Sequence, residues 1–127
     1  MRPPLPPKIA VAIGGALGSA LRFAASGGAH PTWIGTLAVN LIGCAVFGWL
    51  VGARRSSPAL SAGFCGGLTT FSAFAVQLQR GSAGGTAATV ALAIATPLLG
   101  ALVLVLARRI GSGAGPVPGI PVTQEID

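Results

Sequence analysis

Residues 63–74 read GFCGGLTTFSAF and lie near the middle of a hydrophobic segment that runs from about residue 59 to residue 79. Two adjacent glycines, Gly66 and Gly67, weaken helical continuity there, and hydroxyl-bearing residues follow at once. Backbone that leaves the helical conformation at membrane depth is tolerated only where it is buried in protein or lines a cavity. The stretch therefore predicts a discontinuous membrane helix beside a cavity.

The rest of the chain is equally apolar. Of its 127 residues, 52% are hydrophobic and 8% are charged, and the mean hydropathy is +0.79. This composition leaves too little polar surface to coat a soluble domain. A membrane-spanning helix needs about 20 mostly apolar residues. We expect four such helices, over about residues 9–25, 33–52, 59–79 and 86–107.

The expected organisation is an all-α membrane protein with a single transmembrane domain. Residues 1–8 form a basic, proline-rich segment, residues 9–110 form the four-helix transmembrane domain, and residues 111–127 form a disordered tail rich in Gly and Pro. A basic flank before an apolar stretch also opens signal peptides. Because further hydrophobic segments follow, an uncleaved first membrane helix fits better.

Chemically reactive groups are scarce. The two acidic residues, Glu125 and Asp127, both lie at the C-terminal end, so no paired carboxylates are available for acid–base work or for binding a divalent metal. The single histidine, His30, has no triad partners nearby. Cys44 and Cys65 match no zinc or redox spacing and are expected to pack as small residues. The sequence thus predicts that the protein is not an enzyme.

Small residues recur at helical spacing. Gly14, Gly18 and Arg22 fall on one stripe of the first helix, and Gly48 and Gly52 repeat the spacing in the second. Such stripes let helix backbones approach closely.

Two polar residues stand at membrane depth in the first two helices. Asn40 lies near mid-depth, where an amide cannot reach the headgroups; it either joins two helices by a hydrogen bond or lines an ion path. Arg22 lies near the end of the first helix, where it either extends to the headgroups or faces a water-filled vestibule and attracts anions.

Phe71 and Phe74 follow the expected break and share a helix face, beside Thr70 and Ser72. An aromatic ring has a positive edge, so two edges turned inward favour a small, partly dehydrated anion without trapping it. Phenylalanines in membrane helices more often face lipid or the core. Their position directly after the break favours a role in an anion path.

These stretches resemble the family of small bacterial fluoride channels called CrcB or Fluc. The resemblance runs through residues 14–23, 35–48 and 63–74 and a fourth plain hydrophobic helix, and the run GGLTTFSAF is its most specific part. One departure is the fourth helix, which lacks tyrosine and offers only Thr86, Thr89 and Thr96 as hydroxyls.

The resemblance implies an antiparallel dimer with two fluoride pores and one structural sodium ion at its centre. It implies that Gly66 and Thr69 offer backbone carbonyls to sodium. Phe71 and Phe74 would face fluoride. Polar groups of the pore would come from Asn40, Thr70 and Ser72. Arg22 would correspond to the arginine of the vestibule.

Basic residues are distributed unequally between the two sides of the expected membrane. The net charge is +6, yet the basic residues punctuate apolar runs, which favours a topological role over nucleic-acid binding. The side that holds both termini carries the basic residues Arg2, Lys8, Arg54, Arg55, Arg108 and Arg109. The opposite loops carry Arg80. This bias predicts that both termini lie in the cytoplasm. The resemblance implies a multi-pass protein of the bacterial inner membrane.

A fixed orientation affects the choice of partner, because an antiparallel homodimer needs the same chain inserted both ways. We therefore expect pairing with an oppositely oriented paralogue, with a homodimer as the alternative.

Two other functions compete with passive fluoride export. A small multidrug exporter needs an intramembrane carboxylate, which this chain lacks. A holin-like assembly protein accounts for the glycine stripes but not for the glycine pair followed by hydroxyls and two phenylalanines.

Overall fold

The computed structural model describes residues 6–28, 32–81 and 86–113, and their secondary structure is entirely helical. The elements are α1 (Pro7–Ala25), α2 (Trp33–Gly52), the π-helix η1 (Ala59–Cys65), α3 (Gly66–Leu68), α4 (Phe71–Gly81) and α5 (Thr86–Gly113). Four stretches are long and apolar enough to cross a membrane: Pro7–Ala25, Trp33–Gly52, Ala59–Arg80 and Ala93–Gly113. The chain is therefore an all-α, multi-pass membrane protein, as its composition predicted.

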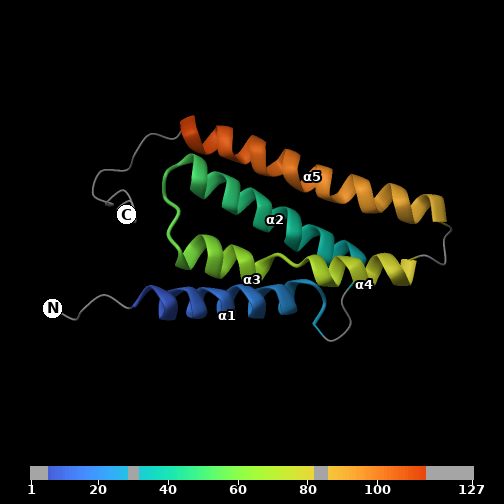
Figure 1. The fold of residues 1–127 in the computed structure, drawn as a ribbon, viewed down its shortest axis with the longest axis horizontal. Helices are drawn as coiled ribbons and strands as arrows, with labels where there is room; N and C mark the ends of the chain where they lie inside the picture. The colour runs from blue at the N-terminus through green and yellow to red at the C-terminus, as the bar shows by residue number, and fades with distance from the viewer. Residues whose placement is uncertain (1–5, 29–31, 82–85, 114–127) are drawn as a thin grey trace.

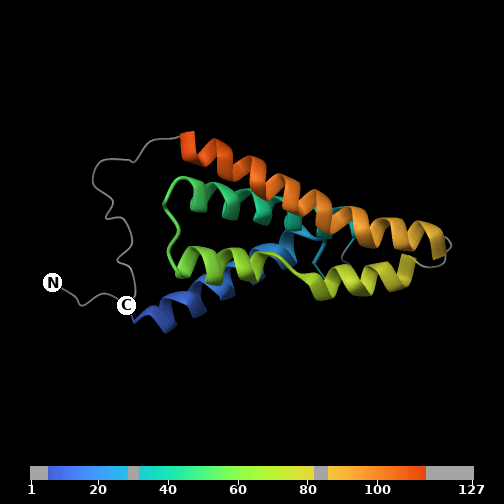
Figure 2. The ribbon, with the colours of Figure 1, turned by 45° about the horizontal axis from the view of Figure 1, so that its top comes forward.

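The helices form an elongated bundle made of two closely packed pairs. Helix α2 packs along α5, and α1 packs along η1 and α3 (Figure 1). Helix α4 contacts both α2 and α5. Figure 2 shows α1 crossing the bundle obliquely. The start of α1, the end of α2 and the end of α5 lie at the same end of the molecule (Figure 1).

Most large apolar side chains face outward. Val39, Leu50 and Leu68 are buried, whereas Ile34 is 76% exposed and Ile110 is 71% exposed. In a membrane protein such surfaces meet lipid or another subunit, because lipid tails are as apolar as the side chains.

Glycines bring α1 onto the third segment. Gly14 and Gly18 are buried, and a Cβ atom at these positions would collide with the backbone carbonyls of Ala59 and Phe64, respectively. The predicted packing role of this stripe is confirmed.

The second glycine pair does the same between α2 and α5. A Cβ atom at Gly48 would collide with the Leu104 carbonyl, and one at Gly52 would collide with the Arg108 carbonyl. The two backbones therefore touch along the C-terminal half of α2.

The non-helical residues of the third segment come directly after the short helix that contains the glycine pair. Gly66 and Gly67 are helical and form most of α3, while helix is absent at Thr69 and Thr70, and Thr69 is extended with φ −87° and ψ 147°. Gly67 lies against the backbone of Gly15 in α1, and this contact holds the glycine pair in the helix.

Helix α5 corrects the expected C-terminal boundary. We expected the helix to end near residue 107 and the tail to begin at residue 111, but α5 continues to Gly113. Gly111 is buried against α2, where its Cβ position is 2.5 Å from the Trp49 carbonyl oxygen, so the last turn is supported by packing. The predicted disorder of the remaining tail concerns residues 114–127, which lie outside the described residues, as does His30.

Candidate functional site

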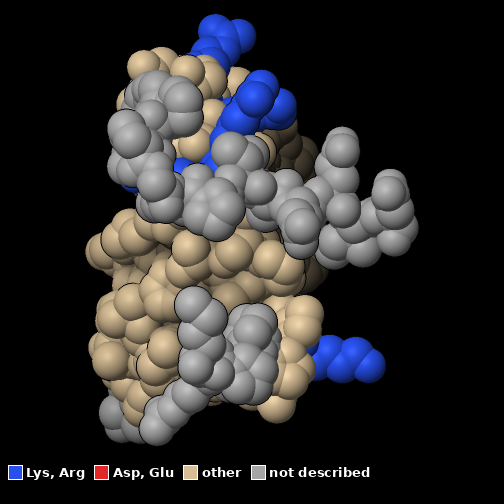
Figure 3. Space-filling model, turned by 90° about the vertical axis from the view of Figure 1, so that its left-hand side faces the viewer, with Lys and Arg blue, Asp and Glu red and all other residues tan. Residues whose placement is uncertain are grey.

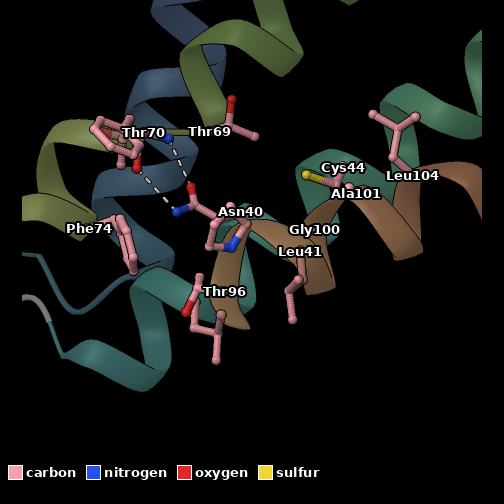
Figure 4. Close-up of a pocket in the computed structure, with 13 residues that line it drawn as sticks. Asn40, Leu41, Cys44, Thr69, Thr70, Phe74, Thr96, Gly100, Ala101 and Leu104 are labelled. Atoms are coloured by element: carbon pink, nitrogen blue, oxygen red, sulfur yellow. Dashed lines mark hydrogen bonds between the residues drawn. The ribbon is translucent and has the colours of Figure 1, made fainter. Parts of the chain in front are cut away.

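Asn40 of α2 pairs with the non-helical backbone of the third segment. Its Nδ2 atom donates a hydrogen bond to the Thr70 carbonyl at 3.1 Å, and its Oδ1 atom accepts one from the Thr70 N–H at 2.8 Å (Figure 4). The amide thus gives the Thr70 N–H the acceptor that it lacks in the helix and adds a donor to the Thr70 carbonyl, and non-helical backbone at membrane depth requires such partners. One N–H of the Asn40 amide is left over for another acceptor.

Thr70 also begins helix α4. Its Oγ1 atom accepts a hydrogen bond from the Ala73 N–H at 3.3 Å, which is the geometry of an N-terminal cap, and it lies 3.0 Å from the Ser72 hydroxyl. The hydroxyls of Thr70 and Ser72 are therefore held together at the first turn of α4. The unpaired N–H groups of such a turn favour negative charge.

These bonds leave two carbonyl groups without their usual helical donors. In a continuous α-helix, Gly66 O would accept from the Thr70 N–H and Thr69 O from the Ala73 N–H. The first N–H donates to Asn40 and the second to Thr70 Oγ1. Gly66 and Thr69 are the two residues expected to offer carbonyls to sodium, and hard cations prefer oxygen ligands of this kind.

Gly66 and Thr69 line one shallow pocket, together with Gly43, Cys44, Phe47 and neighbouring residues. Thr69 Oγ1 donates to the Cys65 carbonyl at 3.0 Å, so its hydroxyl is engaged within its own helix. Within residues 6–28, 32–81 and 86–113, His, Cys, Asp and Glu side chains form no cluster suited to a metal ion. Any cation at this place would depend on backbone oxygens.

Phe71 and Phe74 contact each other at the start of α4. Their ring centroids are 5.8 Å apart and their planes are inclined by 52°. Phe74 is half-buried, whereas Phe71 is 77% exposed. A tilted pair of this kind presents the edge of at least one ring to its surroundings.

The phenylalanines, Asn40 and Thr70 line the same pocket, which measures about 290 Å³ and opens between α2, α4 and α5 (Figure 4). Its wall from α5 includes Thr96, Pro97 and Gly100. These three residues were not among those expected at the site. Pro97 and Thr96 stand in the middle of an otherwise apolar helix, and that position was the signal available for them.

Arg22 lines a third pocket of about 140 Å³, together with Thr36 and Thr70. Its Nε atom is buried and has no hydrogen-bond partner within the part of the chain that the structure describes. The guanidinium group therefore lies partly inside the protein, next to the same non-helical residues that Asn40 binds.

The site is electrostatically suited to an anion. No carboxylate of the described residues lines these pockets, because the acidic side chains of the chain, Glu125 and Asp127, lie outside the described ranges. The polar groups that line the pockets are amide, hydroxyl and guanidinium groups, with aromatic edges beside them. Such groups stabilise a small anion through hydrogen-bond donors and ring edges.

Comparison with known proteins identifies the family of this chain. The family model described as "CrcB-like protein, Camphor Resistance (CrcB)" matches residues 9–109, which include the site and nearly all of the four spans. The chain belongs to the CrcB-like family.

Curated relatives of this CrcB-like chain carry the name "Fluoride-specific ion channel FluC". The relative from Azotobacter vinelandii is 45% identical over 85 residues, which cover 57% of this chain and 68% of the relative. The relative from Stutzerimonas stutzeri is 37% identical over 106 residues, covering 73% and 86%. The relative from Cereibacter sphaeroides is 36% identical over 113 residues, covering 78% and 91%. No solved structure matches this chain.

Proposed function

We propose that this chain is a subunit of a fluoride-specific ion channel that passively exports fluoride from the bacterial cytoplasm and so lowers its toxic concentration. The observation that carries the proposal is the pair Phe71–Phe74, which lies beside the non-helical residues and lines one pocket with Asn40 and Thr70. The relatives' name, fluoride-specific ion channel, supports the same ion and a channel in place of an enzyme.

In this proposal fluoride passes along the pocket between α2, α4 and α5. The ring edges of Phe71 and Phe74 replace part of the ion's hydration shell, and the free N–H of Asn40 and the hydroxyls of Thr70 and Ser72 offer hydrogen bonds. Arg22 raises the local anion concentration without a deep binding site. Passive conduction fits because the described residues that line the pocket include no carboxylate, histidine or amine to exchange protons.

The exposure of Phe71 supports a dimer. A side chain that is 77% exposed at this pocket leaves the path open on one side, and a second subunit would close it. We propose an antiparallel arrangement with an oppositely oriented paralogue, with a homodimer as the alternative. The protein would reside in the inner membrane with both termini in the cytoplasm.

A structural sodium ion is part of the same proposal. The carbonyls of Gly66 and Thr69 would hold it, because their helical donors bind elsewhere and both residues line a pocket that is open to a partner. When bound, sodium would neutralise carbonyl dipoles from both subunits and so stabilise the dimer centre.

Fluoride efflux from liposomes tests the proposal. The chain is reconstituted alone and with the paralogue, and release of fluoride and of chloride is followed with ion-selective electrodes. We expect fluoride release without chloride release in at least one preparation. A third arm replaces sodium by N-methylglucamine, and there we expect a smaller dimer fraction.

Correctly folded chains that release no fluoride in either preparation would refute the proposed function. A dimer fraction unaffected by sodium removal would refute only the sodium site.

A further inference from the structure

The end of the molecule where α2 and α5 finish carries a compact group of arginines, which we call the arginine patch. Its members are Arg54, Arg55, Arg108 and Arg109. Figure 3 views this end and shows several blue Lys and Arg side chains near the top of the view and a separate one at the lower right. Both acidic residues of the chain lie outside the described residues, so no side-chain carboxylate of the described residues neutralises the patch.

Close backbone packing brings the two halves of the patch together. A Cβ atom at Gly52 would collide with the Arg108 carbonyl, and the Cβ position of Gly111 is 2.9 Å from the Ala53 nitrogen. The last turns of α2 and α5 are therefore in backbone contact. Arg54 and Arg55 follow α2, and Arg108 and Arg109 lie in the last turns of α5. This backbone contact therefore places the two pairs at the same end of the bundle, although like charges repel.

The connection after α2 fixes two of these arginines. Arg54 has a φ of 54°, a left-handed conformation that few side-chain-bearing residues adopt, and it reverses the chain at the helix end. Arg55 N–H donates to the Leu50 carbonyl at 2.9 Å, and the Arg55 guanidinium lies 5.2 Å from the centre of the Trp49 ring. This cation–π contact holds one guanidinium over the indole.

The patch borders an exposed apolar surface. Leu102, Leu106 and Ile110 are 54%, 49% and 71% exposed, and their four-residue spacing places them on one stripe of α5. Arg109 follows Leu106 by three residues and so borders this stripe. Positive charge at the margin of an apolar helix face matches a phospholipid, which carries an anionic headgroup and apolar chains. A soluble polyanion would match only the arginines.

We infer that the arginine patch binds the headgroup phosphate of an anionic phospholipid of the phosphatidylglycerol class, whose acyl chains lie along α5. Guanidinium groups form paired hydrogen bonds with phosphate oxygens, so arginines suit this ligand better than lysines. Basic pockets between membrane helices bind anionic headgroups in this way.

The two tryptophans provide a local probe, because Trp33 begins α2 and Trp49 lies at its other end beside Arg55. The variant Trp33→Phe leaves Trp49 as the single tryptophan, and Trp49→Phe leaves Trp33. Both are reconstituted in phosphatidylcholine vesicles that contain a minor fraction of either brominated phosphatidylglycerol or brominated phosphatidylcholine. Bromine quenches indole fluorescence at contact, so quenching reports which lipid lies beside each tryptophan.

We expect Trp49 to be quenched more by brominated phosphatidylglycerol than by brominated phosphatidylcholine, with a local enrichment on the order of five-fold for each arginine engaged. Trp33 should show no such preference. The double substitution Arg108→Gln/Arg109→Gln removes two of the positive charges and should lower the enrichment at Trp49 several-fold. The packing of Gly52 should survive, because it involves the backbone of Arg108 and not its side chain. The control Arg80→Gln, at the opposite end, should leave it unchanged.

Equal quenching of Trp49 by the two brominated lipids would overturn the inference, as would full enrichment in the double variant. A third result also counts against it. If enrichment appears only after removal of residues 114–127, the carboxylates of the tail occupy the patch, and the lipid is not its ligand in the full chain.

Discussion

At the scale of single residues, Asn40 gives the Thr70 N–H the acceptor that a helical turn supplies in continuous helices. Its amide uses one N–H and its oxygen on Thr70, whose own N–H has no helical acceptor. From the sequence, Asn40 was expected either to join two helices or to line an ion path. The structure shows the first role directly, and the position of Asn40 on the pocket wall leaves its second N–H for the second role.

Replacing Asn40 by Leu should destabilise the protein, because the Thr70 N–H then loses its acceptor and the Thr70 carbonyl loses one of its donors. We expect a loss of roughly 1–3 kcal/mol in the free energy of unfolding, measured by unfolding in mixed detergent micelles. Ser72→Ala is the matched control, since it removes an exposed hydroxyl of the same region and should cost little. Equal losses in the two variants would contradict the proposed pairing.

Phe71→Ile and Phe74→Ile should each lower fluoride efflux while leaving dimer assembly intact. The substitutions keep an apolar side chain but remove the positive ring edge. Losing an aromatic edge interaction of about 0.5–1.5 kcal/mol corresponds to a roughly two- to tenfold loss of rate. Efflux from liposomes gives the rate, and cross-linking gives the dimer fraction. Unchanged efflux in both variants would remove the rings from the mechanism.

At the scale of elements, the third segment is held by neighbours on both sides. Helix α1 contacts η1 and α3 through backbone, and α2 contacts the non-helical residues through Asn40. The segment can therefore leave the helical conformation without exposing its polar backbone to lipid. The glycines of α1 supply close packing, whereas the amide of α2 supplies hydrogen bonds.

Two neighbouring glycines of α1 should respond in opposite directions to alanine. At Gly18 the new Cβ atom would collide with the Phe64 carbonyl, and such overpacking costs about 1–3 kcal/mol. At Gly15 the nearest atom to a Cβ would be the Gly63 oxygen, 3.8 Å away, so Gly15→Ala should be neutral or slightly stabilising through higher helix propensity. Thermal unfolding of both variants measures the difference, and a Gly18→Ala protein as stable as Gly15→Ala would contradict the packing.

Hydropathy predicted the existence and approximate limits of the four spans, because lipid imposes length and composition on any helix that crosses it. The glycine pair and the hydroxyl residues after it indicated an interruption near the middle of the third segment. The non-helical residues are Thr69 and Thr70, whereas Gly67 packs against α1 within the helix. The pairing of Asn40 with Thr70 could not be predicted, because the two residues are 30 positions apart and their register depends on tertiary packing. The π-helical conformation of η1 also had no sequence signal.

At the scale of the whole molecule, charge is sorted to one end. Lys8 begins α1, and the arginine patch lies at the ends of α2 and α5, all at the same end of the bundle (Figure 1), whereas Arg80 lies near the end of α4. Such a bias favours a single orientation in the membrane. It is the reason for expecting an oppositely oriented partner.

A reporter fused after Asp127 should show activity only on the cytoplasmic side. Substituting Arg54, Arg55, Arg108 and Arg109 by Gln should move part of the population to the opposite orientation, because the charge difference that fixes the topology is then largely removed. Paired reporters that are active on opposite sides of the membrane give the fraction in each orientation. Similar amounts on both sides for the unaltered chain would refute the fixed orientation and favour a homodimer.

The hydrogen bonds between Asn40 and Thr70 also have a consequence for biogenesis. Synthesis proceeds from the N-terminus, so α2 has entered the bilayer before the third segment leaves the ribosome. A third segment that partitioned alone would carry the unpaired Thr70 N–H into lipid, whereas one that enters beside α2 can pair this group with the Asn40 side chain. The order of the helices along the chain thus supplies the partner before the group that needs it.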